Sequence, residues 1–114
     1  MQYRILMVDD DLKNIKATKG YLELNGFDVS AVQSSEEALM RIKHEEFALV
    51  LLDFKMPDAM GDSVAKMIHE INPLQQIAIY SCDYSREALK LSHQAGVVEF
   101  IEKSSEPQEI LGKV

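Results

Sequence analysis

Short apolar runs alternate with helical segments along this chain, and that alternation restricts the folds it can adopt. The apolar runs are typical of buried strands and lie at about 3–8, 27–32, 48–52, 76–81 and 97–101. Helices are predicted between them at about 12–25, 35–45, 62–71 and 85–94, and Pro107 favours the start of a last helix. Repeated strand–helix units require parallel strands joined by right-handed crossovers, so helices cover both faces of one sheet.

We therefore predict an α/β fold, a doubly wound (βα)5 flavodoxin-like sandwich with a five-stranded parallel sheet of order 2-1-3-4-5. This order makes the first and third strands neighbours at the point where the strand order reverses, and ligands of such sheets bind there. A length of 114 residues fits one domain. Only about eight residues follow the start of the last helix, fewer than in a mean helix, so we expect residues 1–114 to be one domain that stops within that helix.

Local signals at the helix ends agree with this pattern. Gly26 and Gly96 are placed to end helices in a left-handed conformation. Ser34 and Glu37 have the spacing of a capping box, in which each side chain satisfies a free amide of the first turn. Asp11 precedes the first predicted helix and is expected to cap it.

The charge balance and the single cysteine limit the environment and the partners. There are 12 basic and 19 acidic residues, a net charge of −7, which argues against direct nucleic-acid binding. Cys82 is the only cysteine and excludes an internal disulfide, and residues 1–4 do not resemble a secretory leader. No apolar stretch approaches the roughly 20 residues that span a bilayer. We therefore expect a cytoplasmic domain with no membrane partner.

Three apolar runs each end on charged residues. The first run is followed by Asp9, Asp10 and Asp11, the third by Asp53, and the last by Glu102 and Lys103. In the predicted sheet these groups lie at the carboxyl edge, with Asp9 and Asp10 next to Asp53. Taken alone, Asp9 and Asp10 fit helix capping or solvation as well as metal binding, and Asp53 fits a turn. Their joint placement favours a site.

A divalent cation explains why three carboxylates would be gathered. Mutual repulsion disfavours their ionised forms unless a cation compensates. Oxygen ligands that leave room for waters suit Mg²⁺, and Mn²⁺ is the alternative. The three histidines, His44, His69 and His93, lie on different predicted helices without metal-ligand spacing, and we expect them at the surface.

Two further strand ends add groups that suit a phosphoryl ligand. The fourth strand ends on Ser81, and the fifth leads to Lys103. Alone, a serine at a strand end is usually a turn residue and a lysine is usually solvated. Together with a metal, the hydroxyl and the ammonium could hold a phosphoryl group attached to Asp53.

The ordered set of strand-end motifs resembles a receiver domain of a two-component response regulator, the CheY-like family, over essentially the whole chain. The matching segments are Val8–Asp11, Leu51–Asp53 with Met56, Pro57 and Gly61, Tyr80–Ser81, and Phe100–Lys103. The resemblance implies that Asp53 is the phosphoacceptor. It also implies that Asp10 binds Mg²⁺ directly and Asp9 mainly through water, and that the backbone carbonyl of Lys55 is a further ligand.

The same resemblance implies a switch. Ser81 matches the switch hydroxyl, Phe100 the aromatic residue that turns inward, and Lys103 the lysine that contacts the phosphoryl group. The face from the fourth strand to the fifth helix would then change on phosphorylation. The family often has proline after this lysine, whereas Ser104 stands here, and a trans bond is expected because a non-proline cis bond costs about 2.5–4 kcal/mol.

The partners implied by the resemblance are a sensor histidine kinase or phosphotransfer protein and a downstream effector domain or protein. A phosphorylation-dependent homodimer is a further implied assembly. The domain would not be an enzyme beyond accepting and losing its own phosphoryl group. Two alternatives remain, a phosphorylation-independent interaction domain and a phosphate sink. A phosphatase with an aspartate nucleophile is disfavoured, since such enzymes carry a second aspartate where this chain has Lys55.

Overall fold

Strands and helices alternate along the chain as the apolar pattern predicts. The computed structural model describes residues 3–53, 60–81, 90–91, 93–97 and 99–102. Its elements are β1 (Arg4–Val8), α1 (Leu12–Leu24), β2 (Asp28–Val32), α2 (Ser35–His44), β3 (Leu49–Leu52), α3 (Gly61–Ile71), β4 (Ile77–Ser81) and β5 (Glu99–Glu102). Residues 90, 91, 93 and 94, within the helix predicted at 85–94, are helical. The helix predicted from Pro107 lies outside the described residues.

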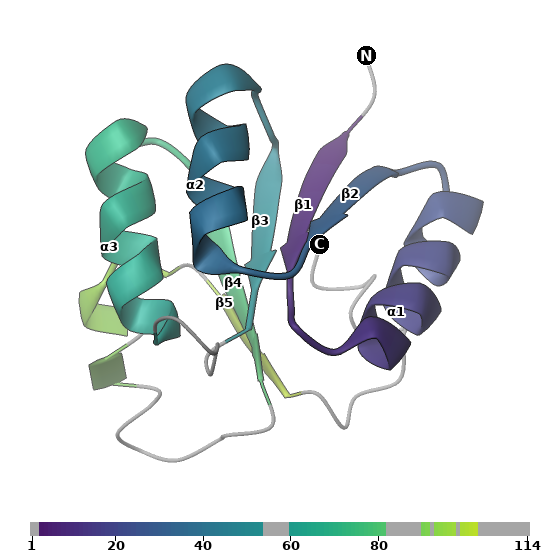
Figure 1. Ribbon diagram of the computed structural model, residues 1–114. Coiled ribbons are helices and arrows are strands. Elements are labelled where there is room, and N and C mark those ends of the chain that lie inside the picture. Colours follow the sequence, from purple (N-terminus) through teal and green to yellow (C-terminus); the bar gives the residue numbers. More distant parts are fainter. Residues whose placement is uncertain (1–2, 54–59, 82–89, 92, 98, 103–114) are drawn as a thin grey trace.

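The strands form one parallel sheet with the order β2-β1-β3-β4-β5, which confirms the predicted fold class (Figure 1). β1 pairs on one side with β2, from Arg4↔Asp28 to Val8↔Val32. On its other side it pairs with β3, where Val8 lies opposite Leu52. The last residues of β1 and β3 are therefore side by side, and so are the acidic residues that follow them.

Alternate side chains of the strands build two cores, one on each face of the sheet. Leu6 and Val8 of β1 pack with residues of α2 and α3, such as Ile68. Ile5 and Met7 point to the opposite face and pack with Leu22 of α1. Figure 1 shows α1 on one side of the sheet and α2 and α3 on the other. Burying each large apolar side chain stabilises the fold by about 1.5–3 kcal/mol, so both faces hold the sheet in place.

The helices are short and their ends follow the predicted signals. α1, α2 and α3 have 13, 10 and 11 residues, and no helix in the described part of the chain has the length and apolar character needed to cross a bilayer. Ser34 Oγ accepts a hydrogen bond from the Glu37 amide at 3.2 Å. Gly26 and Gly96 have φ angles of 93° and 85°, in the left-handed region that glycine adopts at little cost.

The fifth strand differs from its predicted range of 97–101. β5 covers Glu99–Glu102, because its pairing with β4 runs from Ala78↔Glu99 to Ser81↔Glu102. Gly96 still turns the chain in the left-handed conformation, and Val97 lies between that turn and the strand. Because Val97 is apolar, the predicted strand starts two residues before the observed β5.

Candidate functional site

Two buried aspartates, Asp9 and Asp53, directly follow the last residues of β1 and β3. The Asp53 amide donates a hydrogen bond to the Val8 carbonyl at 2.9 Å, and the Asp9 amide donates to the Val32 carbonyl at 3.1 Å. Asp9 is 1 % exposed and Asp53 6 %. Their main chains therefore continue the hydrogen-bonding pattern of the sheet beyond the apolar residues, which fixes where both side chains start.

Asp9, Asp10 and Asp53 form one cluster, which we call the acidic triad. Each contributes a carboxylate oxygen, and these oxygens lie within 4.8 Å of one another. The adjacency predicted from the strand ends is thus correct. Asp10 is exposed, in contrast to its two buried partners, so the cluster keeps contact with solvent on one side.

The composition of the acidic triad fits a hard divalent cation. All three donors are carboxylate oxygens, the ligands that Mg²⁺ and Mn²⁺ accept. Two of them are buried, where an ionised carboxylate is costly without compensation. Solvent access at Asp10 suits Mg²⁺ in particular, because this ion usually retains several waters.

Asp11 has a different task from the triad. Its Oδ1 accepts a hydrogen bond from the Lys13 amide at 3.0 Å and so caps α1, as predicted. Its own amide donates to Oδ1 of Asp9 at 2.9 Å. The start of α1 therefore helps to orient the Asp9 carboxylate, and the cap and the site are built by the same turn.

The remaining predicted site residues are placed only through the backbone, or lie outside the described residues. Ser81 is the last residue of β4, which pairs with β3, so its main chain lies at the same edge as Asp53. Phe100 is in β5, opposite Ile79. The side chains of Ser81 and Phe100 lie outside the described part of the chain, as do Lys55, Lys103 and the Lys103–Ser104 bond.

One histidine does not match the prediction. His44 and His93 are exposed, but His69 is half-buried, with its Nε2 2.9 Å from the carbonyl oxygen of Gln75. It lies beside the buried Ile68 and one turn after the buried Ala65, so it flanks the apolar stripe of α3. That spacing was the available signal for its burial. No local signal predicted its contact with Gln75, which is six residues away along the chain.

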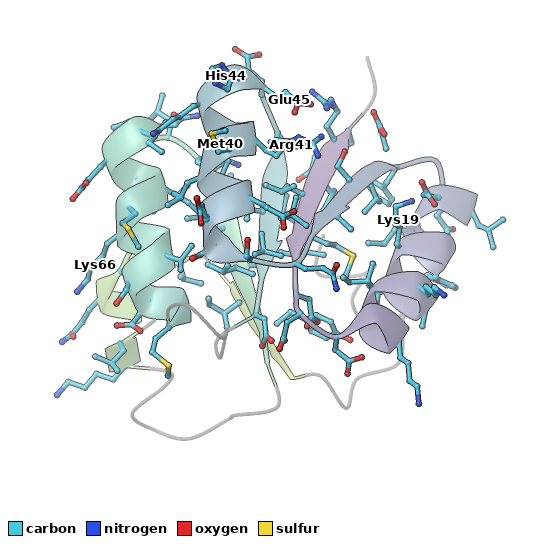
Figure 2. All side chains as sticks on the ribbon, viewed as in Figure 1. Lys19, Met40, Arg41, His44, Glu45 and Lys66 are labelled. Atoms are coloured by element: carbon cyan, nitrogen blue, oxygen red, sulfur yellow. The ribbon has the colours of Figure 1, made fainter. Side chains whose placement is uncertain are left out.

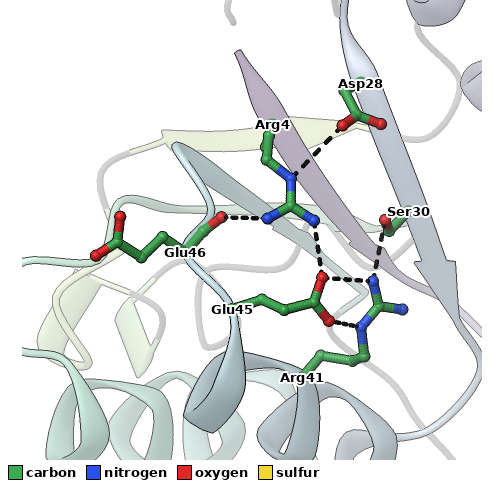
Figure 3. A network of polar contacts seen from close by, with 6 residues as sticks. All are labelled: Arg4, Asp28, Ser30, Arg41, Glu45 and Glu46. Atoms are coloured by element: carbon green, nitrogen blue, oxygen red, sulfur yellow. Dashed lines mark hydrogen bonds and ion pairs between the residues drawn. The ribbon is translucent and has the colours of Figure 1, made fainter. Parts of the chain in front are cut away.

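A network of opposite charges occupies the other end of the sheet (Figure 3). Arg4, at the start of β1, contacts Glu45 at 2.8 Å, the Glu46 carbonyl at 3.1 Å and Asp28 at 3.5 Å. Arg41 of α2 binds the same Glu45 carboxylate. We call these charged residues, with Ser30, the arginine network; its members are Arg4, Asp28, Ser30, Arg41, Glu45 and Glu46.

The arginine network shifts the acidity of its central carboxylate. Hydrogen bonds from Arg41 and then from Arg4 lower the pKa of Glu45 from 4.5 to about 2. The hydrogen bond between Arg41 and Glu45 also raises the pKa of Arg41. The guanidinium carbons of Arg4 and Arg41 lie 4.8 and 5.8 Å from the ring centre of Phe47, close enough for cation–π attraction. These contacts tie β1, β2 and the end of α2 together.

Comparison with known proteins places the chain among signalling domains. The family profile described as the response regulator receiver domain matches residues 5–114. The CAI-1 autoinducer sensor kinase/phosphatase CqsS of Vibrio cholerae is 31% identical over 115 residues, covering 97% of this chain and 17% of that protein. A transcriptional regulatory protein, the CpxR homolog of Haemophilus influenzae, is 29% identical over 113 residues, covering 97% and 48%. The chain thus spans less than half the length of these curated relatives.

Solved structures show the same architecture. A CheY-like response regulator receiver domain protein from Methanospirillum hungatei superimposes with a TM-score of 0.95 at 33% identity, covering 99% of this chain and 90% of that one. The BeF3-activated receiver domain of DrrB, a Thermotoga maritima protein, gives a TM-score of 0.89 at 26% identity, covering 99% and 94%. Both superpositions cover nearly the whole chain.

Proposed function

The chain belongs to the response regulator receiver domain family of two-component systems, and from that membership we propose that residues 1–114 act as one receiver domain that accepts a phosphoryl group on Asp53. The observation that carries the proposal is the acidic triad, in which three carboxylates at neighbouring strand ends lie within 4.8 Å. Asp53 is the nucleophile in this proposal, and Asp9 and Asp10 are the metal ligands beside it.

The transfer itself is a displacement at phosphorus. A carboxylate oxygen of Asp53 attacks the phosphoryl group carried by a histidine of a sensor kinase or phosphotransfer protein. A P–O bond forms, the P–N bond breaks, and the nitrogen keeps the electron pair. Asp53 suits this role because its amide is hydrogen-bonded to Val8, which fixes where its side chain starts at the end of β3.

The metal site uses residues that gather at the same edge. Asp9, Asp10 and Asp53, with the backbone carbonyl of Lys55, would hold Mg²⁺ or Mn²⁺, which neutralises charge on the phosphoryl oxygens when bound. The hydrogen bond from Asp11 to Asp9 orients one of these carboxylates before any ligand arrives. Asp10 provides the solvent-facing side.

Phosphorylation would be read by residues on β4 and β5. A phosphoryl group on Asp53 carries roughly 1.5 to 2 negative charges, in place of the single charge of the carboxylate. In the proposed switch, Ser81 donates a hydrogen bond to it, Lys103 pairs with its oxygens, and Phe100 turns inward. The position of Ser81 at the end of β4 supports this role. The new contacts favour one of two pre-existing states of the face from β4 to the fifth helix.

The output is a change in binding, with no turnover beyond the domain's own phosphorylation and dephosphorylation. One relative is named a transcriptional regulatory protein, which supports an output of this kind, and this chain covers 17% of the other, which is named a sensor kinase/phosphatase. We propose that the altered face engages an effector domain, a partner protein or a second phosphorylated copy. The description of DrrB as BeF3-activated supports a beryllofluoride test of the same switch here.

The decisive experiment is labelling with acetyl phosphate and Mg²⁺, followed by intact-mass spectrometry. We expect Asp53→Asn to abolish the added phosphoryl mass. Asp28→Asn, the same substitution in a half-buried aspartate of the arginine network, should leave labelling unchanged. Full labelling of Asp53→Asn would refute the assignment. Labelling without any spectral change on adding beryllofluoride would instead support a phosphate sink.

A further inference from the structure

The outer edge of β2 and the adjoining side of α2 form a groove of about 380 Å³, lined by Ala31, Val32, Glu36, Glu37, Met40 and Arg41. We propose that this groove binds an extended, basic segment of a partner protein, which adds as a strand to the edge of β2. Figure 2 labels Met40 and Arg41, which both lie on α2. The Arg41 side chain reaches β2, where it donates a hydrogen bond to Ser30. The proposal concerns an interaction surface and does not depend on Asp53.

The backbone of β2 offers the first part of the argument. Asp28 donates its amide hydrogen bond to Tyr3, and Val32 accepts one from Asp9, so both point toward β1. Main-chain groups alternate in direction along a strand, and those of Val29 and Ala31 therefore point to the outer edge. In the described sheet β2 is an end strand, with no strand beyond it. Such an edge can pair with an extended peptide.

The groove also offers an apolar contact next to that edge. The Ala31 side chain packs toward the α1 face, whereas Val32 packs on the α2 face. Ala31 lines the groove although its side chain packs on the α1 face, so the groove borders its main chain. Met40 is 59 % exposed beside it, and a flexible thioether accommodates apolar side chains of different shapes. A peptide side chain on the α2 side would bury Met40.

The charges of the groove select the chemistry of the partner. The lining contains two carboxylates, those of Glu36 and Glu37, and one guanidinium, that of Arg41, which also binds Glu45 and Ser30. The excess charge in the groove is thus negative. A second copy of this chain would bring the same carboxylates and a net charge of −7 to the interface, and like charges disfavour that pairing. Lysine or arginine next to apolar residues is complementary.

A synthetic peptide of alternating lysine and valine is the probe, and a peptide of alternating glutamate and valine is its charge-reversed control. In a titration of the ¹⁵N-labelled chain we expect the lysine peptide to shift the amides of Ala31 and Met40. The Ala31 amide should also gain protection from hydrogen exchange, because it becomes part of a strand pair. The affinity should fall as salt is raised.

Charge reversal in the groove tests the site. Glu37→Lys should lower the affinity for the lysine peptide at least about tenfold, since a like charge then faces the ligand. Glu70→Lys makes the same change on an exposed position of α3 and should leave the affinity unchanged. Circular dichroism of both variants checks that they are folded. Asp53→Asn should bind the peptide as the unsubstituted chain does, so this test and the phosphorylation test can fail separately.

Three results would overturn the proposal. The first is equal binding of the lysine and glutamate peptides. The second is binding without any change at Ala31 or Met40. The third is sedimentation of the chain alone as a dimer whose Ala31 amide is already protected, which would assign this edge to self-association.

Discussion

The two ends of β1 handle charge in opposite ways. At the amino end, Arg4 and Arg41 surround the carboxylate of Glu45, so charges of opposite sign alternate. At the carboxyl end, Asp9, Asp10 and Asp53 bring charges of the same sign together. The arginine network ties elements of the fold to one another. The acidic triad gathers groups that repel one another, an arrangement that a bound divalent cation would stabilise.

The difference also lies in how each cluster is held. Side chains of the arginine network position one another through ion pairs, and those of Arg4 and Glu45 are about a third exposed. Exposed pairs of this kind contribute little to stability, because solvent screens the two charges. The aspartates of the triad are positioned by the sheet, through the main-chain hydrogen bonds of Asp9 and Asp53. We therefore expect substitutions in the triad to alter ligand binding and those at the other end to alter stability alone.

The largest effect on ligand binding is expected for Mg²⁺. Asp10→Asn should weaken Mg²⁺ binding by about 10-fold or more, measured by calorimetric titration, because a charged ligand is lost. Without metal, the same variant should unfold at a higher temperature, since fewer like charges face one another. Asp28→Asn is the matched control in the arginine network and should keep the Mg²⁺ affinity. An equal loss of Mg²⁺ affinity in both variants would contradict the expected difference between the two ends of β1.

The next effect is expected for Gly96, just before β5. Gly96→Ala places a Cβ atom 2.9 Å from the His69 ring and forces alanine to a φ of 85°, so we expect a loss of about 2–4 kcal/mol in denaturant unfolding. Gly26→Ala is the matched control, because φ is 93° there but nothing lies within 4 Å. It should cost about 1–2 kcal/mol.

A double variant separates the two causes at Gly96. His69→Ala removes the ring that the new methyl group meets, so Gly96→Ala should cost less in that background. An unchanged cost would mean that the backbone conformation alone is responsible. Neither variant should alter Mg²⁺ affinity if the two ends of the sheet act separately.

The smallest effect is expected for Glu45 and depends on pH. Its pKa is lowered from 4.5 to about 2 in the folded chain, so the folded state favours the ionised form. The stabilisation is therefore complete above about pH 4.5 and disappears as the pH falls toward 2. Thermal unfolding of the unsubstituted chain and of Glu45→Gln should differ slightly near pH 6 and converge near pH 2. A gap that widens in acid would contradict this assignment.

The fold and the triad could be predicted because both follow from local patterns. Apolar runs of strand length separated by helical segments determine parallel strands, and the residue after each run lies at the carboxyl edge. The cap formed by Asp11 was predictable for the same reason. Ser81 and Lys103 were assigned to the same edge from their strand ends, whereas their roles in the switch came from the resemblance, and these roles remain proposals.

Other features had no local signal. The pairing of Arg4 with Glu45 joins residues 41 positions apart, and nothing in either neighbourhood indicates the other. The contact of His69 with Gln75 likewise depends on how the chain turns after α3. The start of β5 is set by its register with β4, which an apolar run such as Val97 does not reveal.

Because the Asp53 amide is hydrogen-bonded to the Val8 carbonyl, formation of the acidic triad depends on how β1 and β3 are aligned. Asp9 and Asp53 are 53 − 9 = 44 residues apart in the chain and meet only when β1 and β3 pair in their native register. A slip of one residue would turn the side chains of the moved strand to the opposite face of the sheet. If the triad binds Mg²⁺ as proposed, metal affinity would depend on the alignment of the central strands, and its appearance during refolding would show when β1 and β3 pair.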